Sequence, residues 1–229
     1  MLKKTLTALS CSMIAAAAFG GTTPLPPPQP SEPLPEPVLI SYDNFSINYN
    51  FSSADLLGLD VEGHGVQAGL EISPVKHLYF AINGGWSNLE LDLAGTGLGV
   101  GDLDFDYWTG NAGIGGYIPI TENIHFVTEV GASYANLGFD SFGANLSTDD
   151  WGIYVTPHFR AKWGAFETHF GVTYNSNDLV VSEWTGFARI LVEVAPQVDL
   201  FVAGTVGFQD DEDAFEDVFG VQAGVRFKF

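Results

Sequence analysis

The chain has 229 residues, of which 28 are acidic and only 8 basic, so its formal net charge is −20. This acidity argues against a nucleic-acid partner, because proteins bind phosphates mainly through Lys and Arg. Aromatic residues make up 14% of the chain, charged residues only 16%, and glycine is abundant. That composition favours many short strands joined by turns.

Residues 1–20 are predicted to be a cleaved signal peptide. Lys3 and Lys4 form a basic segment, a mostly apolar stretch follows, and Ala18 and Gly20 are small residues at the positions that a signal peptidase reads. Cys11 lies inside the apolar stretch, so we expect the mature chain to have no cysteine and no disulfide. After cleavage no run of about 20 apolar residues remains, so the sequence predicts no transmembrane helix.

Residues 21–41 are dominated by proline, which favours an extended conformation of roughly 3 Å per residue. We interpret this segment as a spacer. A docking segment for a partner is the alternative.

From residue 42 onward the sequence predicts strands. Apolar and polar side chains alternate with a period of two, which places them on opposite faces of a strand. Ten segments show this pattern, each long enough for a tilted strand to cross a membrane. They are approximately 42–51, 61–72, 77–90, 104–118, 123–137, 150–162, 165–175, 183–195, 198–209 and 217–229.

The predicted connections alternate in length. Those around Pro74, Pro119–Asn123, Trp163–Gly164 and Pro196 are tight. The intervening connections 52–60, 91–103, 138–149, 176–182 and 210–216 are longer and polar. Such alternation is typical of barrels with short turns at one end and long loops at the other.

Aromatic residues are concentrated near the predicted strand ends, as in the interfacial girdles of membrane barrels. They are Tyr42, Trp86, Trp108, Tyr134, Trp151, Trp163, Tyr174, Trp184 and Phe229. The last segment reads F-G-V-Q-A-G-V-R-F-K-F, and its apolar face ends on Phe227 and Phe229.

These features resemble the small outer-membrane β-barrel proteins, the broad OmpA-, OmpX- and opacity-protein-like group. The resemblance covers residues 42–229 and implies an all-β fold, a single antiparallel up-and-down transmembrane β-barrel. Ten strands are counted here, with eight as the alternative, because well-known members of the group have eight. The resemblance implies an outer-membrane location and contact with outer-membrane lipids. It also makes Phe227 and Phe229 an insertion signal for the outer-membrane assembly machinery.

An even number of strands places both termini and the spacer in the periplasm, and we expect a monomer. The predicted role is structural or surface-interacting, because the resemblance rests on architecture and fold does not fix function. The first alternative is a narrow porin-like channel for small solutes. The second is an enzyme at the outer rim, a protease or a lipid-modifying enzyme. We expect no enzymatic activity and no cofactor.

The inward parity of the predicted strands contains nine charged residues: Glu71, Glu129, Arg160, Lys162, Glu167, Arg189, Glu193, Arg226 and Lys228. Arg160 is predicted to face Glu167 across the turn at Trp163–Gly164. The charges can form a salt-bridge network that fills the lumen, or a constriction that selects permeating solutes. Pro157 lies within a predicted strand and lacks an amide hydrogen, so we expect a bulge or a shifted register there.

No metal site is expected. In the same register His158 faces His169, and two imidazoles are the residues on which a transition-metal site would be built. On the long-loop side Asp210, Asp211 and Asp213 belong to an acidic cluster. The cluster is interpreted as a solvated anionic surface, with Ca²⁺ or Mg²⁺ bridging to lipid phosphates as the alternative.

Overall fold

The computed structural model describes residues 40–56, 59–91, 93, 103–141, 144–208 and 215–229. All of them belong to a compact unit, Pro37–Phe229, that separates from Met1–Glu36. The signal peptide, most of the spacer and the loop carboxylates Asp210, Asp211 and Asp213 lie outside the described residues, so the expectations for them stay predictions. Within the described part of the chain, no helix is long and apolar enough to cross a membrane.

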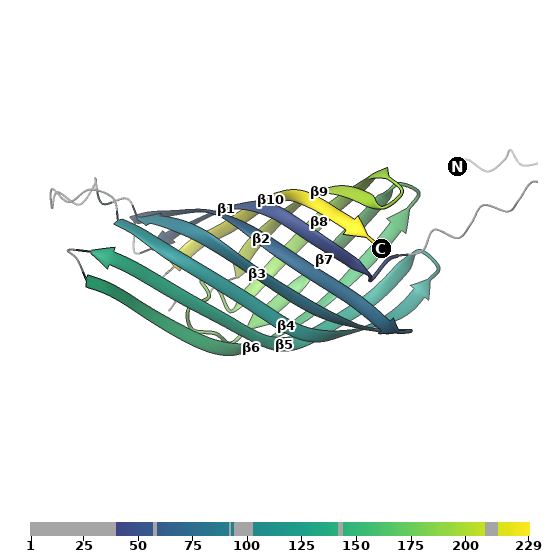
Figure 1. Cartoon of the computed structure of the whole chain (residues 1–229), viewed down its shortest axis with the longest axis horizontal. Coiled ribbons are helices and arrows are strands. Elements are labelled where there is room, and N and C mark those ends of the chain that lie inside the picture. The colour runs from purple at the N-terminus through teal and green to yellow at the C-terminus, as the bar shows by residue number, and fades with distance from the viewer. Residues whose placement is uncertain (1–39, 57–58, 92, 94–102, 142–143, 209–214) are drawn as a thin grey trace, which may run out of the picture. The chain divides into compact units, whose positions relative to one another are not determined.

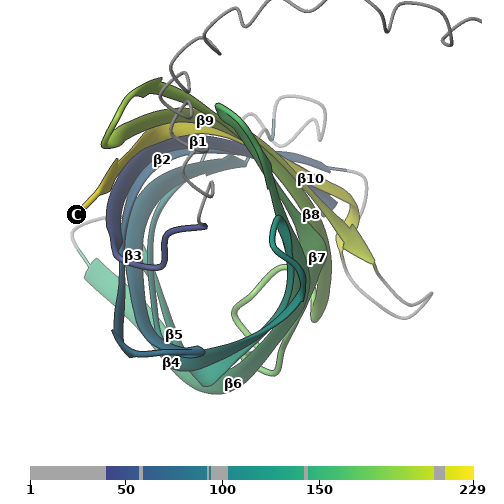
Figure 2. The ribbon, with the colours of Figure 1, turned by 90° about the vertical axis from the view of Figure 1, so that its right-hand side faces the viewer.

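Ten antiparallel strands close into one barrel, in which each strand pairs with the next and β1 pairs with β10 (Figures 1 and 2). The predicted count of ten is therefore confirmed over the alternative of eight. The strands are β1 (Asn44–Leu56), β2 (Leu59–Val75), β3 (Leu78–Leu91), β4 (Leu103–Thr121), β5 (Ile124–Ser141), β6 (Ala144–Trp163), β7 (Phe166–Asn175), β8 (Trp184–Ala195), β9 (Val198–Phe208) and β10 (Phe215–Lys228).

Two-residue connections join β2 to β3, β4 to β5, β6 to β7 and β8 to β9, all at one end of the barrel. We call this end the turn side and the opposite end the loop side. In the β6–β7 connection Gly164 has a φ of 57°, a left-handed conformation that glycine adopts without strain. His77 in the β2–β3 connection has a φ of 71°. These tight turns fix the register of the hairpins that they join.

Two of the predicted long connections are wrong. Residues 52–56 and 59–60 continue β1 and β2, and residues 138–141 and 144–149 continue β5 and β6. The polar residues there, such as Ser53 and Asp149, lie on the parity that is apolar further along the strand, while the backbone pairing goes on. Beyond the lipid layer the outward face of a strand can meet water, so polar residues on that face do not end it.

The barrel is apolar outside and polar inside. Ile82, Ile118 and Leu200 point outward and are 56%, 66% and 48% exposed, whereas Asn48 and Ser133 are buried inside. A soluble barrel has the opposite arrangement, so this one is built to be surrounded by lipid. The exposed outer surface also includes Trp108, Trp151, Trp163 and Trp184, as the girdle prediction requires.

The bulge expected at Pro157 is absent. On one side of Pro157, Val155 pairs with Tyr174, and on the other His158 pairs with Gly171, in the same register. The pairing to β5 is continuous through Pro157. The missing amide hydrogen interrupts the ladder to β7 locally and leaves the register unchanged.

Candidate functional site

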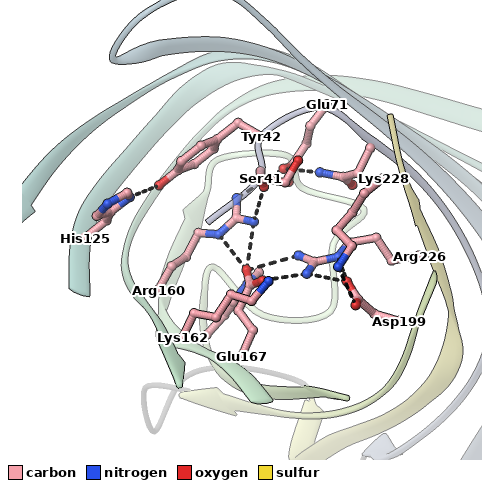
Figure 3. A network of polar contacts seen from close by, with 12 residues as sticks. Ser41, Tyr42, Glu71, His125, Arg160, Lys162, Glu167, Asp199, Arg226 and Lys228 are labelled. Atoms are coloured by element: carbon pink, nitrogen blue, oxygen red, sulfur yellow. Dashed lines mark hydrogen bonds and ion pairs between the residues drawn. The ribbon is translucent and has the colours of Figure 1, made fainter. Parts of the chain in front are cut away.

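Glu167 is the centre of a buried ionic network in the turn-side half of the lumen (Figure 3). Its side chain comes from β7 and is 2% exposed. Arg160 of β6 donates to its carboxylate at 3.0 Å, Arg226 of β10 donates at 2.5 and 3.0 Å, and His169 Nε2 donates at 2.7 Å. β7 and β10 are not neighbours in the barrel, so this contact crosses the lumen.

The network extends from Glu167 to further strands. Arg160 also reaches Glu71 on β2 at 3.1 Å, a second contact across the lumen. Arg226 continues to Asp199 on β9. The remaining ion pairs are Lys228–Asp199 at 2.9 Å, Lys228–Glu193 at 2.6 Å and Lys162–Glu193 at 3.2 Å. Side chains from six strands (β2, β6, β7, β8, β9 and β10) therefore tie the interior together.

Residues just before β1 enter the same half of the lumen. Tyr42 is only 4% exposed, and its ring is stacked on Tyr117 at 4.1 Å between ring centroids. Its hydroxyl is 3.0 Å from His125 Nδ1, and the Arg160 guanidinium lies 4.3 Å from the centre of its ring. Arg160 also donates to the carbonyl of Ser41 at 2.9 Å (Figure 3).

The position of Tyr42 corrects its prediction as a girdle residue. It is held by cation–π and stacking contacts inside the barrel and does not face the lipid boundary. Burial raises the pKa of Tyr42 above its ordinary value, so its hydroxyl remains protonated. The segment is anchored further by Asp43, whose carboxylate accepts the Ser73 amide at 2.7 Å.

Nearer the loop side, the β7–β8 connection folds over the lumen. The hydroxyl of Tyr107, an inward residue of β4, donates to the carbonyl of Leu179 at 3.1 Å. Asn177 is buried, and its side-chain amide donates to the Asp150 carbonyl at 2.9 Å. Figure 2 shows this connection inside the ring of strands. The lumen thus contains polypeptide near both ends.

The described part of the chain folds as a closed antiparallel β-barrel of ten strands. No family model and no curated protein matches its sequence. Among solved structures, it is similar to the attachment invasion locus protein Ail of Yersinia pestis, crystallised with a heparin analogue, with 15% identity and a TM-score of 0.44. That match covers 82% of this chain and 97% of the other.

Two further solved structures are similar to this chain. Neisserial surface protein A shares 13% identity with a TM-score of 0.44, covering 82% of this chain and 98% of its own. OprG from Pseudomonas aeruginosa shares 14% identity with a TM-score of 0.44, covering 83% of this chain and 98% of its own.

The structure brings seven of the nine predicted lumen charges into the network. The other two lie apart from its ion pairs. Glu129 accepts hydrogen bonds from the hydroxyls of Tyr79 at 2.9 Å and Tyr154 at 2.5 Å. Arg189 lies over the ring of Phe201, with 4.7 Å between its guanidinium carbon and the ring centre.

The predicted cross-strand partners are wrong by two residues. Lys162 pairs with Glu167 and Arg160 with His169, whereas Arg160 was expected opposite Glu167. The turn is centred one residue later than predicted, because its two residues are Gly164 and Ala165. A shift of two keeps every side chain on its face, so Arg160 still reaches Glu167 diagonally.

The predicted pairing of His158 with His169 is wrong by the same shift of two residues. His158 pairs with Gly171 and not with His169, and the two imidazole rings are 6.2 Å apart. His169 is bonded to Glu167, and His158 Nδ1 lies 3.2 Å from the Thr156 carbonyl. Among the residues that the structure describes, no group of three His, Cys, Asp or Glu side chains could hold a metal ion.

Sequence reasoning missed Asp199, which is 2% exposed and bonded to two basic side chains. It is the second residue of β9 and lies within the predicted strand 198–209, but it was not included among the predicted lumen charges. Its parity is the signal that could have identified it, because Asp199 shares a face with the buried Phe201 and Ala203.

Proposed function

We propose that this protein is a closed outer-membrane barrel that anchors the chain in the membrane and presents its loop side at the cell surface. The observation that carries the proposal is the ionic network that crosses the lumen through Glu167. Arg160 and Glu167 are 1% and 2% exposed in their side chains, so little water reaches the centre of the network. Barrels of about this strand number are narrow enough to be filled by their own side chains.

The Tyr42 segment supports the same proposal. Ile40 and Tyr42 pack inside the barrel with Tyr79 and Val127, beside the ion pairs. An aromatic stack and a salt-bridge network at one level leave the turn-side half occupied by protein. A structural or surface-interaction role follows more directly from such an interior than permeation does.

Permeation is tested by the swelling of proteoliposomes in small sugars. The wild-type barrel is expected to be impermeable. A Tyr42→Ala, Arg160→Ala double variant is expected to admit small solutes, because it removes the ring and the guanidinium that stacks on it. Heat-dependent migration on a gel verifies that both proteins are folded. Rapid swelling with the wild type would favour the narrow porin-like channel.

Three finer points belong to the proposal. The turn side and both termini face the periplasm, as an even strand number requires. Phe227, on the outward face of β10, and Phe229, the exposed residue directly after this strand, are recognised by the assembly machinery. The protein acts as a monomer. Its acidic loops form a solvated anionic surface, and Ca²⁺ or Mg²⁺ bridging to lipid phosphates is the alternative, which a Ca²⁺ titration against thermal stability tests.

The enzyme alternative has less support. His64 is the rim-proximal histidine on which an active site would be built, and it lies on the outward face of β2. Its Nδ1 is 2.6 Å from the hydroxyl of Tyr49, another outward residue. An imidazole in that place faces lipid and does not meet a substrate in the rim. Incubating the folded protein with a general peptide substrate tests this, and no cleavage is expected.

A further inference from the structure

Arg189 is a cation of the lumen without a carboxylate partner among the described residues. No ion pair in the described part of the chain includes it, and its Nε atom is buried without a hydrogen-bond partner there. Its direct neighbours across the strands are His169 on β7 and Ala203 on β9. Its guanidinium carbon lies 4.7 Å from the centre of the Phe201 ring.

The carboxylates of the network are already engaged. Glu71 accepts from Arg160 and from Asn44 at 2.8 Å, and Glu167 accepts from three side chains. Glu193 forms ion pairs with Lys162 and Lys228. Asp199 forms ion pairs with Arg226 and Lys228. Glu129 is satisfied by two tyrosine hydroxyls. None of these carboxylates forms an ion pair with Arg189.

The pairing of the other lumen cations points the same way. Each of them forms at least one ion pair with Glu71, Glu167, Glu193 or Asp199; they are Arg160, Lys162, Arg226 and Lys228. Arg189 is half-buried, and its buried Nε has no such partner among the described residues. A polar group buried without a partner is unfavourable, so a site of this kind is completed by an anion.

We propose that Arg189 is the cationic half of an anion-binding site in the lumen, which takes a small carboxylate. The planar guanidinium offers parallel N–H donors that match the two oxygens of a carboxylate. Arg189 precedes Glu193 by four residues on β8 and is therefore farther from the β8–β9 turn. The anion would occupy the part of the lumen on the loop side of the Glu193 ion pairs. An anion can bind here whether or not the barrel conducts, so the site is independent of the proposed function.

The test uses the mature protein, refolded in detergent, and follows its unfolding temperature by tryptophan fluorescence. Sodium acetate is titrated at constant ionic strength, with sodium chloride as the balancing salt. A saturable rise in unfolding temperature is expected for the wild type. The rise is expected to be lost in Arg189→Gln and kept in Lys76→Gln, which removes an exposed turn-side charge.

An equal acetate effect in the wild type and Arg189→Gln would overturn the proposal. A linear, non-saturating effect in all three proteins would do the same, as would saturation by chloride alone. If Arg189→Gln does not fold, Arg189→Lys replaces it, since Lys keeps the charge and loses the planar donors. Its acetate midpoint is expected to be at least tenfold higher than that of the wild type, and an unchanged midpoint would contradict the site.

Discussion

Replacing Glu167 by Gln is the most informative single change to the network. Gln keeps the size of the side chain and removes the charge that Arg160 and Arg226 share. Breaking a buried ion pair costs about 3–5 kcal/mol, because the remaining charge is left uncompensated. Arg160 keeps Glu71, and Arg226 keeps Asp199, so the expected loss is at the lower end, about 3 kcal/mol.

The measurement is equilibrium unfolding in guanidinium chloride with the barrel in lipid vesicles, followed by tryptophan fluorescence. The matched control is Glu122→Gln, which removes the same charge from an exposed turn. Its effect should stay within about 0.5 kcal/mol, as for most surface substitutions. If Glu167→Gln changed the free energy of unfolding no more than Glu122→Gln does, the network would not hold the lumen together.

Three further predictions follow from single positions. Gly115→Ala places a methyl group 2.0 Å from the ring of Tyr79 and is expected to destabilise the barrel by about 1–3 kcal/mol in the same unfolding assay; Gly84→Ala, whose nearest neighbour atom is 3.6 Å away, should be nearly neutral. Glu193→Gln should cost no more than about 1 kcal/mol, because this carboxylate is 30% exposed and water screens its lysine partners; a loss as large as that of Glu167→Gln would contradict the ranking by burial. Phe229→Ala should slow the appearance of heat-resistant folded protein in cells while leaving refolding in detergent unchanged, and equal slowing in both would assign the residue to folding alone.

The fold could be predicted from the sequence because its pattern is local. Alternation with a period of two fixes which side chains of a strand share a face, and it does so without knowledge of the partner strand. The predicted centre of the β6–β7 turn was wrong by one residue, so the predicted partner of Arg160 was wrong by two. A shift of two keeps Arg160 on the lumen face. The inward set of charges was therefore predicted far better than their pairing.

The remainder depends on contacts between distant parts of the chain. Tyr42 precedes the first strand, and only closure of the barrel brings it to Tyr117 and His125. Asp199 shares its parity with Phe201 and Ala203, but its two basic partners, Arg226 and Lys228, lie on another strand and are not visible in the local pattern. The strand ends at 52–56 and 144–149 carry polar residues such as Ser53 and Asp149 on the outward face, so the predicted strands stopped before the real ones did.

Single-channel recording of the mature protein in a planar bilayer tests the central claim, that protein side chains close the lumen. Insertion of folded barrel is verified on the same sample by heat-dependent gel migration. The account predicts a folded protein that gives no conductance steps. Discrete, repeated steps from the wild type would show a continuous aqueous passage and contradict it.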